Sequence, residues 1–146
     1  MRIYLDVCCL KRPFDDQSQP RIHLESEALL ALLGAPADRA EFIHAPAHDL
    51  ENNQNPLPVR AERVREWLTV MPLVELPDQA LVARTAELMA LGFKNFDALH
   101  LASAEGAGAD VVVTCDDRLL AAARRHAASL RVRVAAPLEL VAEMFP

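Results

Sequence analysis

The alternation of apolar and polar positions along the chain predicts strands separated by helices. Short apolar or β-branched runs predict four strands, at 2–6, 41–45, 110–115 and 130–135. Apolar residues at helical spacing, together with capping and breaking residues, predict the helices. They are expected over 21–33, in a short segment ending near Glu51, around 61–68, from Asp78 to Gly92, from Asn95 to Gly106, from Asp116 or Asp117 to His126, and from Pro137 onwards. The stretch after the first strand, "CLKRPFDDQSQP", reads as a polar loop, and "LTVMPLVEL" as an apolar connection with room for one short strand.

This alternation predicts the fold class and the domain organisation. Strands that alternate with helices are typical of an α/β protein, in which a parallel sheet is covered by helices on both faces. The chain has 146 residues, the usual length of one compact domain, and contains no repeat or linker. We therefore expect one domain over residues 1–146.

Composition limits the classes of protein to which the chain can belong. Apolar residues make up 52% of the chain, and no apolar run approaches the roughly 20 residues of a membrane span. The N-terminal apolar stretch is too short for a secretion signal and is broken by Asp6, so we expect a cytoplasmic protein. The three cysteines are then expected to be reduced, buried thiols that act as small apolar side chains. His44 and His48 are four residues apart, but a structural zinc site would need two further ligands that no Cys or His pair offers.

The net charge of −6 bears on nucleic-acid binding. It argues against nonspecific binding of duplex DNA or RNA through a basic face. It is compatible with a small metal-dependent nuclease, because a cluster of carboxylates adds negative charge that a metal ion offsets.

Acidic residues stand where the predicted strands end or the predicted helices begin. Asp6 directly follows the first strand, and Asp116 directly follows the third. Parallel strands present their carboxyl ends at one edge of a sheet, where ligands bind, so these two acids are expected at the same edge. Glu51 lies on the element leaving the second strand, and Asp97 opens a helix that leads to the third.

Each carboxylate also has an ordinary structural explanation. Asp97 stands in the first turn of a helix, where a negative charge contributes about 0.3–1 kcal/mol. Asp116 or Asp117 can cap a helix, which contributes about 1 kcal/mol. Asp6 is harder to explain in this way, because an acid that ends a buried strand has a desolvation cost unless it is paired. Taken together, four acids at one edge favour a site for Mg²⁺ or Mn²⁺, which prefer oxygen ligands.

The same segments resemble PIN-domain ribonucleases, particularly the VapC-like toxins of toxin–antitoxin pairs. The opening "YLDVCCLKRPFDD", the segment "HDLENNQNP" and above all "NFDALHLASAEGAGADVVVTCDDRLL" are similar to the motifs of that family. The resemblance matches Asp6, Glu51, Asp97 and Asp116 to its four metal-binding acids. It leaves Asp117 as a fifth carboxylate ligand or a helix cap.

This resemblance implies a three-layer α/β/α sandwich around a mainly parallel sheet, and an endoribonuclease that depends on Mg²⁺ or Mn²⁺. It also implies an RNA substrate, a homodimer, and a cognate antitoxin protein that occupies the acidic groove. The chain departs from the common pattern at Cys8, where many members carry Ser, Thr or Asn.

Two other functions remain open at this stage. One is a PIN-like module that binds RNA or protein and cleaves weakly or not at all, which the Cys8 departure and the acidic charge favour. The other is a phosphotransfer enzyme with Asp6 as the nucleophile. The latter would need a second Asp where Cys8 stands.

Overall fold

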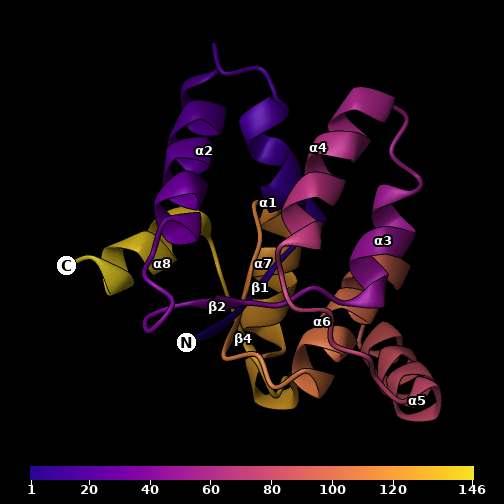
Figure 1. The fold of residues 1–146 in the computed structure, drawn as a ribbon. Coiled ribbons are helices and arrows are strands. Elements are labelled where there is room, and N and C mark those ends of the chain that lie inside the picture. Colours follow the sequence, from indigo (N-terminus) through magenta and orange to yellow (C-terminus); the bar gives the residue numbers. More distant parts are fainter.

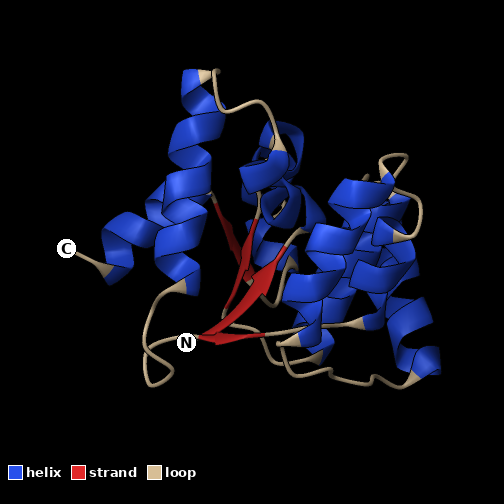
Figure 2. Cartoon of the chain, turned by 45° about the horizontal axis from the view of Figure 1, so that its top comes forward, coloured by secondary structure: helices blue, strands red, loops and turns tan.

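The computed structural model describes all 146 residues and centres on a four-stranded parallel sheet (Figure 2). The strands are β1 (Arg2–Leu5), β2 (Glu41–Phe42), β3 (Val111–Val113) and β4 (Arg133–Ala135). They pair in the order β2-β1-β3-β4, and every pair is parallel. The predicted parallel sheet is therefore confirmed, although each strand is shorter than the apolar run that predicted it.

Eight helices surround this sheet (Figure 1). They are α1 (Val7–Lys11), α2 (Pro20–Leu33), α3 (Pro46–Asn52), α4 (Pro58–Thr69), α5 (Asp78–Ala90), α6 (Asn95–Gly106), α7 (Asp117–Arg125) and α8 (Pro137–Met144). None of them combines the length and the apolar character that crossing a membrane requires. The helix α5 ends as predicted, with Gly92 just beyond it at φ 110°, a conformation that glycine adopts without strain.

The helices form a layer on each face of the sheet. Alternate residues of β1 and β3 point to opposite faces, so that Ile3 and Leu5 pack with α1, α2, α4 and α8. Tyr4 and Val112 pack on the other face with α5, α6 and α7. This is the three-layer α/β/α sandwich that the sequence predicted.

The main departure from the predicted elements is α1, which forms where a polar loop was expected. Val7, Cys9 and Leu10 are buried by this short helix, and the N–H groups of Cys9 and Leu10 both donate to the Asp6 carbonyl, at 2.9 and 3.3 Å. The burial of these three apolar side chains stabilises the helix. The neighbouring Lys, Arg and Pro made the segment read as a polar loop in the sequence.

The strand order creates a crevice at the carboxyl ends of β1 and β3. The chain leaves β1 through α1 on one face of the sheet and leaves β3 through α7 on the other. Such a change of direction between neighbouring strands is where open α/β sheets bind ligands. Because β1 and β3 are hydrogen-bonded neighbours, Asp6 and Asp116 stand at adjacent strand ends.

Candidate active site

Asp6 lies at the centre of this crevice. Its backbone N–H donates to the Val113 carbonyl at 2.9 Å, which extends the pairing of β1 with β3 by one residue and buries the carboxylate to 6% exposure. The hydroxyl of Thr114 donates to Asp6 Oδ2 at 2.8 Å, and the thiol of Cys8 donates to the same oxygen at 3.2 Å. Burial raises the pKa of Asp6 well above its ordinary value, and the nearby Cys8 and Glu51 raise it further.

Cys8, the departure from the family pattern, takes part in this polar network. Besides its bond to Asp6, its sulfur lies 3.3 Å from the Thr114 hydroxyl and accepts the Cys115 N–H at 3.3 Å. The thiol thus supplies a hydrogen-bond donor to Asp6, the contact that a hydroxyl could make at this position.

Glu51 reaches the crevice from α3 and meets a histidine that the sequence analysis did not single out. His100, on α6, is 1% exposed, and its Nε2 lies 3.0 Å from Glu51 Oε1. Its Nδ1 lies 2.6 Å from the hydroxyl of Tyr4. A carboxylate only accepts hydrogen bonds, so Nε2 carries the hydrogen and a neutral ring accepts from Tyr4 at Nδ1. His100 therefore fixes the orientation of Glu51.

The charges around His100 govern its protonation. Burial alone would lower the pKa of its imidazole, but the hydrogen bond to Glu51 and the negative charge of Asp6 raise that pKa overall. The ligand atoms of Asp6, Glu51 and His100 all lie within 4.8 Å of one another. The structure thus brings together the first two predicted acids and adds an imidazole.

Asp97 lies in the first turn of α6, three residues before His100 and so close to the same helix face. It is half-buried and receives no hydrogen bond from the protein. Burial raises the pKa of its carboxyl, and the charges of Asp116 and Glu51 raise it further, so Asp97 lies within electrostatic reach of each of them. The helix begins at Asn95, as expected, and Lys94 is its N-cap.

Of the two acids that could cap α7, Asp116 is the cap. Its Oδ1 accepts the N–H groups of Arg118 and Leu119 at 2.9 and 3.4 Å, while its own N–H donates to the Thr114 hydroxyl at 3.1 Å. Its Oδ2 receives no hydrogen bond from the protein and stays available to a ligand. The hydroxyl of Thr114 consequently links Asp6 to the start of α7.

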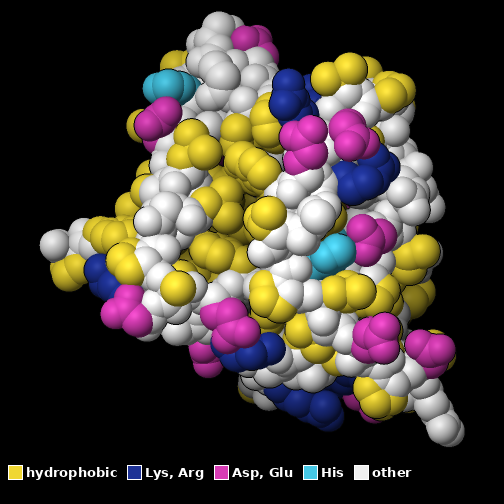
Figure 3. Space-filling model, in the orientation of Figure 1, with side chains coloured by type: hydrophobic (Ala, Val, Ile, Leu, Met, Phe, Trp, Pro, Cys, Tyr) yellow, Lys and Arg dark blue, Asp and Glu magenta, His cyan; other side chains and the backbone are white.

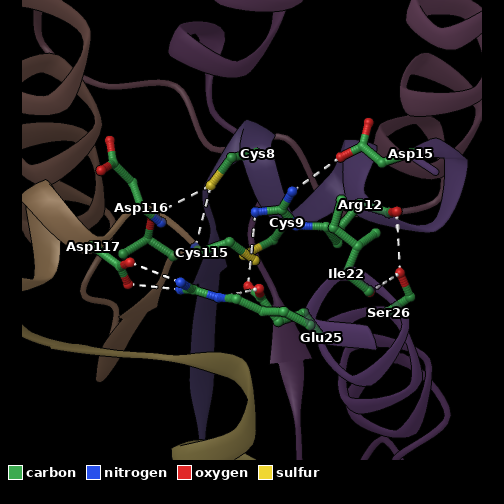
Figure 4. A network of polar contacts seen from close by, with 12 residues as sticks. Cys8, Cys9, Arg12, Asp15, Ile22, Glu25, Ser26, Cys115, Asp116 and Asp117 are labelled. Carbon is green, nitrogen blue, oxygen red and sulfur yellow. Dashed lines mark hydrogen bonds and ion pairs between the residues drawn. The ribbon is translucent and has the colours of Figure 1, made fainter. Parts of the chain in front are cut away.

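Asp117 lies apart from the other acids. Its side chain is 68% exposed, and its two oxygens accept from the guanidinium of Arg21 at 2.8 and 2.7 Å. The hydrogen bonds from Arg21 lower the pKa of this carboxyl. Figure 4 shows that the carboxylates of Asp116 and Asp117 point in different directions, and only that of Asp117 pairs with Arg21. The structure does not bring Asp117 to the cluster.

The other two histidines of this region have their own partners. Both ring nitrogens of His48 are hydrogen-bonded: Nδ1 accepts the Ala45 N–H at 2.9 Å, so Nε2 donates to the Leu5 carbonyl at 2.7 Å. Burial lowers the pKa of His48 to about 3, and the ring stacks on Tyr4 at 4.3 Å between centroids. His44 pairs with Asp49 at 2.7 Å. These contacts support the floor of the site and leave no histidine pair free for zinc.

The donor set fits a divalent cation that prefers oxygen ligands. Asp6 and Glu51 lie together with His100, and Asp97 lies within electrostatic reach of Glu51 and Asp116. None of these four acids forms an ion pair with Lys or Arg, and His100 is their basic neighbour. Carboxylates taken out of water are costly, and a bound cation would reduce that cost. Their oxygens are the ligands that Mg²⁺ and Mn²⁺ bind.

The fold and the crevice place the protein in the class of α/β proteins that have an acidic site at the topological switch point of a parallel sheet. Within that class, the family model of the PIN domain matches residues 3–125. The chain therefore belongs to the PIN-domain family, whose members are generally nucleases. No curated protein matches the sequence.

Solved structures agree with this fold. VapBC-1 from nontypeable Haemophilus influenzae has a TM-score of 0.56 at 10% identity, over 94% of this chain and 99% of that one. VapBC2 from Rickettsia felis gives 0.55 at 12%, over 93% and 98%. FitAcB from Neisseria gonorrhoeae gives 0.53 at 18%, over 93% and 98%. At these identities the likeness concerns the arrangement of the chain.

Proposed function

We propose that the protein is an endoribonuclease that depends on Mg²⁺ or Mn²⁺ and hydrolyses RNA phosphodiester bonds at the acidic crevice. In this proposal Asp6, Glu51, Asp97 and Asp116 hold the metal, and Asp117 serves the pairing with Arg21. One observation carries the proposal. Asp6 is buried, its ligand atom lies within 4.8 Å of those of Glu51 and His100, and it forms no ion pair with Lys or Arg.

The residues of the chain have distinct tasks in this reaction. A divalent ion held by the four acids would activate a water molecule and offset charge on the phosphoryl oxygens. Thr114 keeps Asp6 in place and ties it to the end of β3. His100, itself held by Tyr4, keeps Glu51 turned toward Asp6. His100 is thus a positioning residue in this proposal.

The substrate that suits this site is single-stranded RNA. Scissile phosphates are accessible in single-stranded loops and ends, where bases can be splayed out. Aromatic residues make up only 5% of the chain, which argues against an extended platform for base stacking. Recognition would then rest on the phosphate backbone and on the metal.

A protein partner belongs to the same proposal, with the protein as the toxin of a toxin–antitoxin pair. We infer a homodimer and an antitoxin that covers the crevice, by likeness to the VapBC structures. Apolar side chains gather in the hollow between α2 and α4 (Figure 3), and Leu24, Leu30, Leu57 and Val59 are exposed. Light scattering tests the dimer: about twice the 16.1 kDa mass of one chain supports it, and the mass of one chain contradicts it.

The activity itself is tested by cleavage of a pooled single-stranded RNA. Wild type and Asp97→Asn are compared with Mn²⁺ and with EDTA. We expect wild type to cut only with Mn²⁺ and Asp97→Asn to lose the activity, because the variant removes one ligand charge without altering the core. Asp117→Asn is the matched control and is expected to cut like wild type. RNA binding without cleavage by folded wild type would instead favour the catalytically inactive binding module.

A further inference from the structure

The three cysteines of the chain meet at one point beside Asp6, to which Cys8 donates a hydrogen bond. Cys8 and Cys9 lie in the first turn of α1, and Cys115 stands two residues after the end of β3 (Figure 4). The sulfurs of Cys9 and Cys115 are 3.5 Å apart, and all three sulfurs lie within 4.8 Å of one another. No disulfide joins them. They were expected to be reduced, buried thiols that act as small apolar side chains; they are free thiols, and they form a cluster.

The spacing of these sulfurs matches that of a metal site. A zinc–sulfur bond is about 2.3 Å long, so thiolates around one ion would lie about 3.8 Å apart in a tetrahedral arrangement and about 4.0 Å apart in a planar one. In the cluster one sulfur–sulfur separation is 3.5 Å and the other two are no more than 4.8 Å, so all three sulfurs lie close to the spacing that one ion requires. Thiolates select soft ions such as Cu(I) and Zn(II) over Mg²⁺.

The surroundings of the cluster include a cation and an opening to solvent. The guanidinium of Arg12 belongs to the same network, where it pairs with Asp15 at 3.2 Å and lies 3.8 Å from Glu25 (Figure 4). Its Nε is buried without an acceptor. Cys115 also lines a cavity of about 280 Å³ bounded by α2, α7 and α8, and Cys8 is partly exposed. An ion can therefore approach the cluster from solvent.

We propose that Cys8, Cys9 and Cys115 form a second metal site, which binds a single soft closed-shell ion of the Cu(I), Zn(II) or Cd(II) type through three sulfurs. Each thiol that ligates the ion releases its proton, and no electron is transferred. The site is distinct from the acidic crevice in its chemistry. It also touches the crevice, because the ion would withdraw the Cys8 thiol from Asp6, to which it now donates a hydrogen bond.

The probe for this site is Cd²⁺, because thiolate ligation to this ion gives an ultraviolet charge-transfer band whose intensity follows the number of sulfurs bound. The reduced protein is titrated with Cd²⁺ in excess Mg²⁺, which occupies oxygen sites. We expect the band to saturate at one equivalent. Each of the single variants Cys8→Ser, Cys9→Ser and Cys115→Ser should lose about a third of the intensity and bind at least tenfold more weakly.

Asp97→Asn is the matched control, since it weakens the acidic crevice and touches none of the thiols. It should reproduce the wild-type Cd²⁺ curve, so this test does not depend on nuclease activity. Circular dichroism verifies that each variant is folded, and Cys8→Ser, at the partly exposed position, carries the test if a buried variant fails to fold. The proposal is overturned if wild type shows no band saturating at one equivalent, if the Cys→Ser variants keep the full band, or if Asp97→Asn abolishes it.

Discussion

Replacing Asp6 with Asn should stabilise the metal-free protein and abolish its stabilisation by metal. The carboxylate is almost fully buried, has no Lys or Arg partner, and accepts hydrogen bonds from Thr114 and Cys8. An amide oxygen can accept both bonds, so the substitution removes the charge while the contacts remain. Measured costs of burying polar groups lie at about 1–3 kcal/mol, which sets the scale of the gain.

Metal binding acts in the opposite direction. An ion that binds only the folded state at a concentration of 100 times its Kd stabilises that state by about 2.7 kcal/mol. A change of 1 kcal/mol moves Tm by roughly 2–4 °C at this chain length. Wild type should therefore gain roughly 5–11 °C from Mn²⁺, and Asp6→Asn close to none.

Thermal unfolding of both proteins in EDTA and in Mn²⁺ checks this crossover. Asp117→Asn is the control, because it neutralises an exposed carboxylate paired with Arg21 and should retain the full Mn²⁺ gain. Equal Mn²⁺ gains in wild type and Asp6→Asn would refute the assignment of Asp6 as a ligand. A large loss of stability of Asp6→Asn in EDTA would refute the argument that the buried charge of Asp6 destabilises the metal-free protein.

Three further predictions follow from the same contacts. Thr114→Val keeps the shape of the side chain and removes the hydroxyl, so Asp6 loses its shorter hydrogen bond. The substitution should cost about 1–3 kcal/mol in denaturant unfolding and weaken Mn²⁺ binding in calorimetry. An unchanged stability and Mn²⁺ affinity would contradict the role given to the Thr114–Asp6 hydrogen bond. Because the pKa of Asp6 is raised in the folded state, that state binds this proton more tightly than the unfolded chain does. The gain in stability from Asp6→Asn should therefore be full above the raised pKa and shrink as pH falls toward the ordinary pKa of Asp. Mn²⁺ affinity should fall over the same window, since Asp6 and Asp97 must lose their protons to bind metal; a flat pH profile would argue against both. Leu101→Ala, at a fully buried position of α6, should cost about 2–5 kcal/mol in denaturant unfolding, and a cost under 1 kcal/mol would contradict the packing described for that face.

The layered fold followed from the sequence because its signals are local and repeated. Helical spacing, together with Pro at the start of a helix and Gly after its end, located α2 and α4 to α8 to within a few residues. The strand ends were less predictable. The run at 41–45 continues through the buried Ile43 and Ala45. Regular pairing of β2 with β1 nevertheless ends at Phe42, which is paired with Ile3.

The candidate site was only partly predictable for a different reason. Asp6 and Asp116 were placed at one edge by the rule that parallel strands end together, and the strand order then made them neighbours. His100 was missed, because a single histidine in an apolar helix has no local signal, and only the tertiary contact with Glu51 gives it a role. The only available hint was its spacing of three residues from Asp97, which places both near one face of α6.

The sequence also could not distinguish the role of Asp117 from that of Asp116. Two consecutive acids at the start of a helix point about 100° apart around its axis, and the sequence does not say which one faces the crevice. The partner of Asp117 is Arg21, which lies 96 residues away in the chain. Such a contact is determined by the packing of α2 against the end of β3.

The central claim, that four acids at the sheet edge hold a divalent metal, is tested most directly by anomalous diffraction from crystals grown with Mn²⁺ in place of Mg²⁺. The account predicts a strong anomalous peak between Asp6, Glu51, Asp97 and Asp116, and none at Asp117. A well-ordered crevice without a peak at saturating Mn²⁺, or a peak only elsewhere on the molecule, would contradict it.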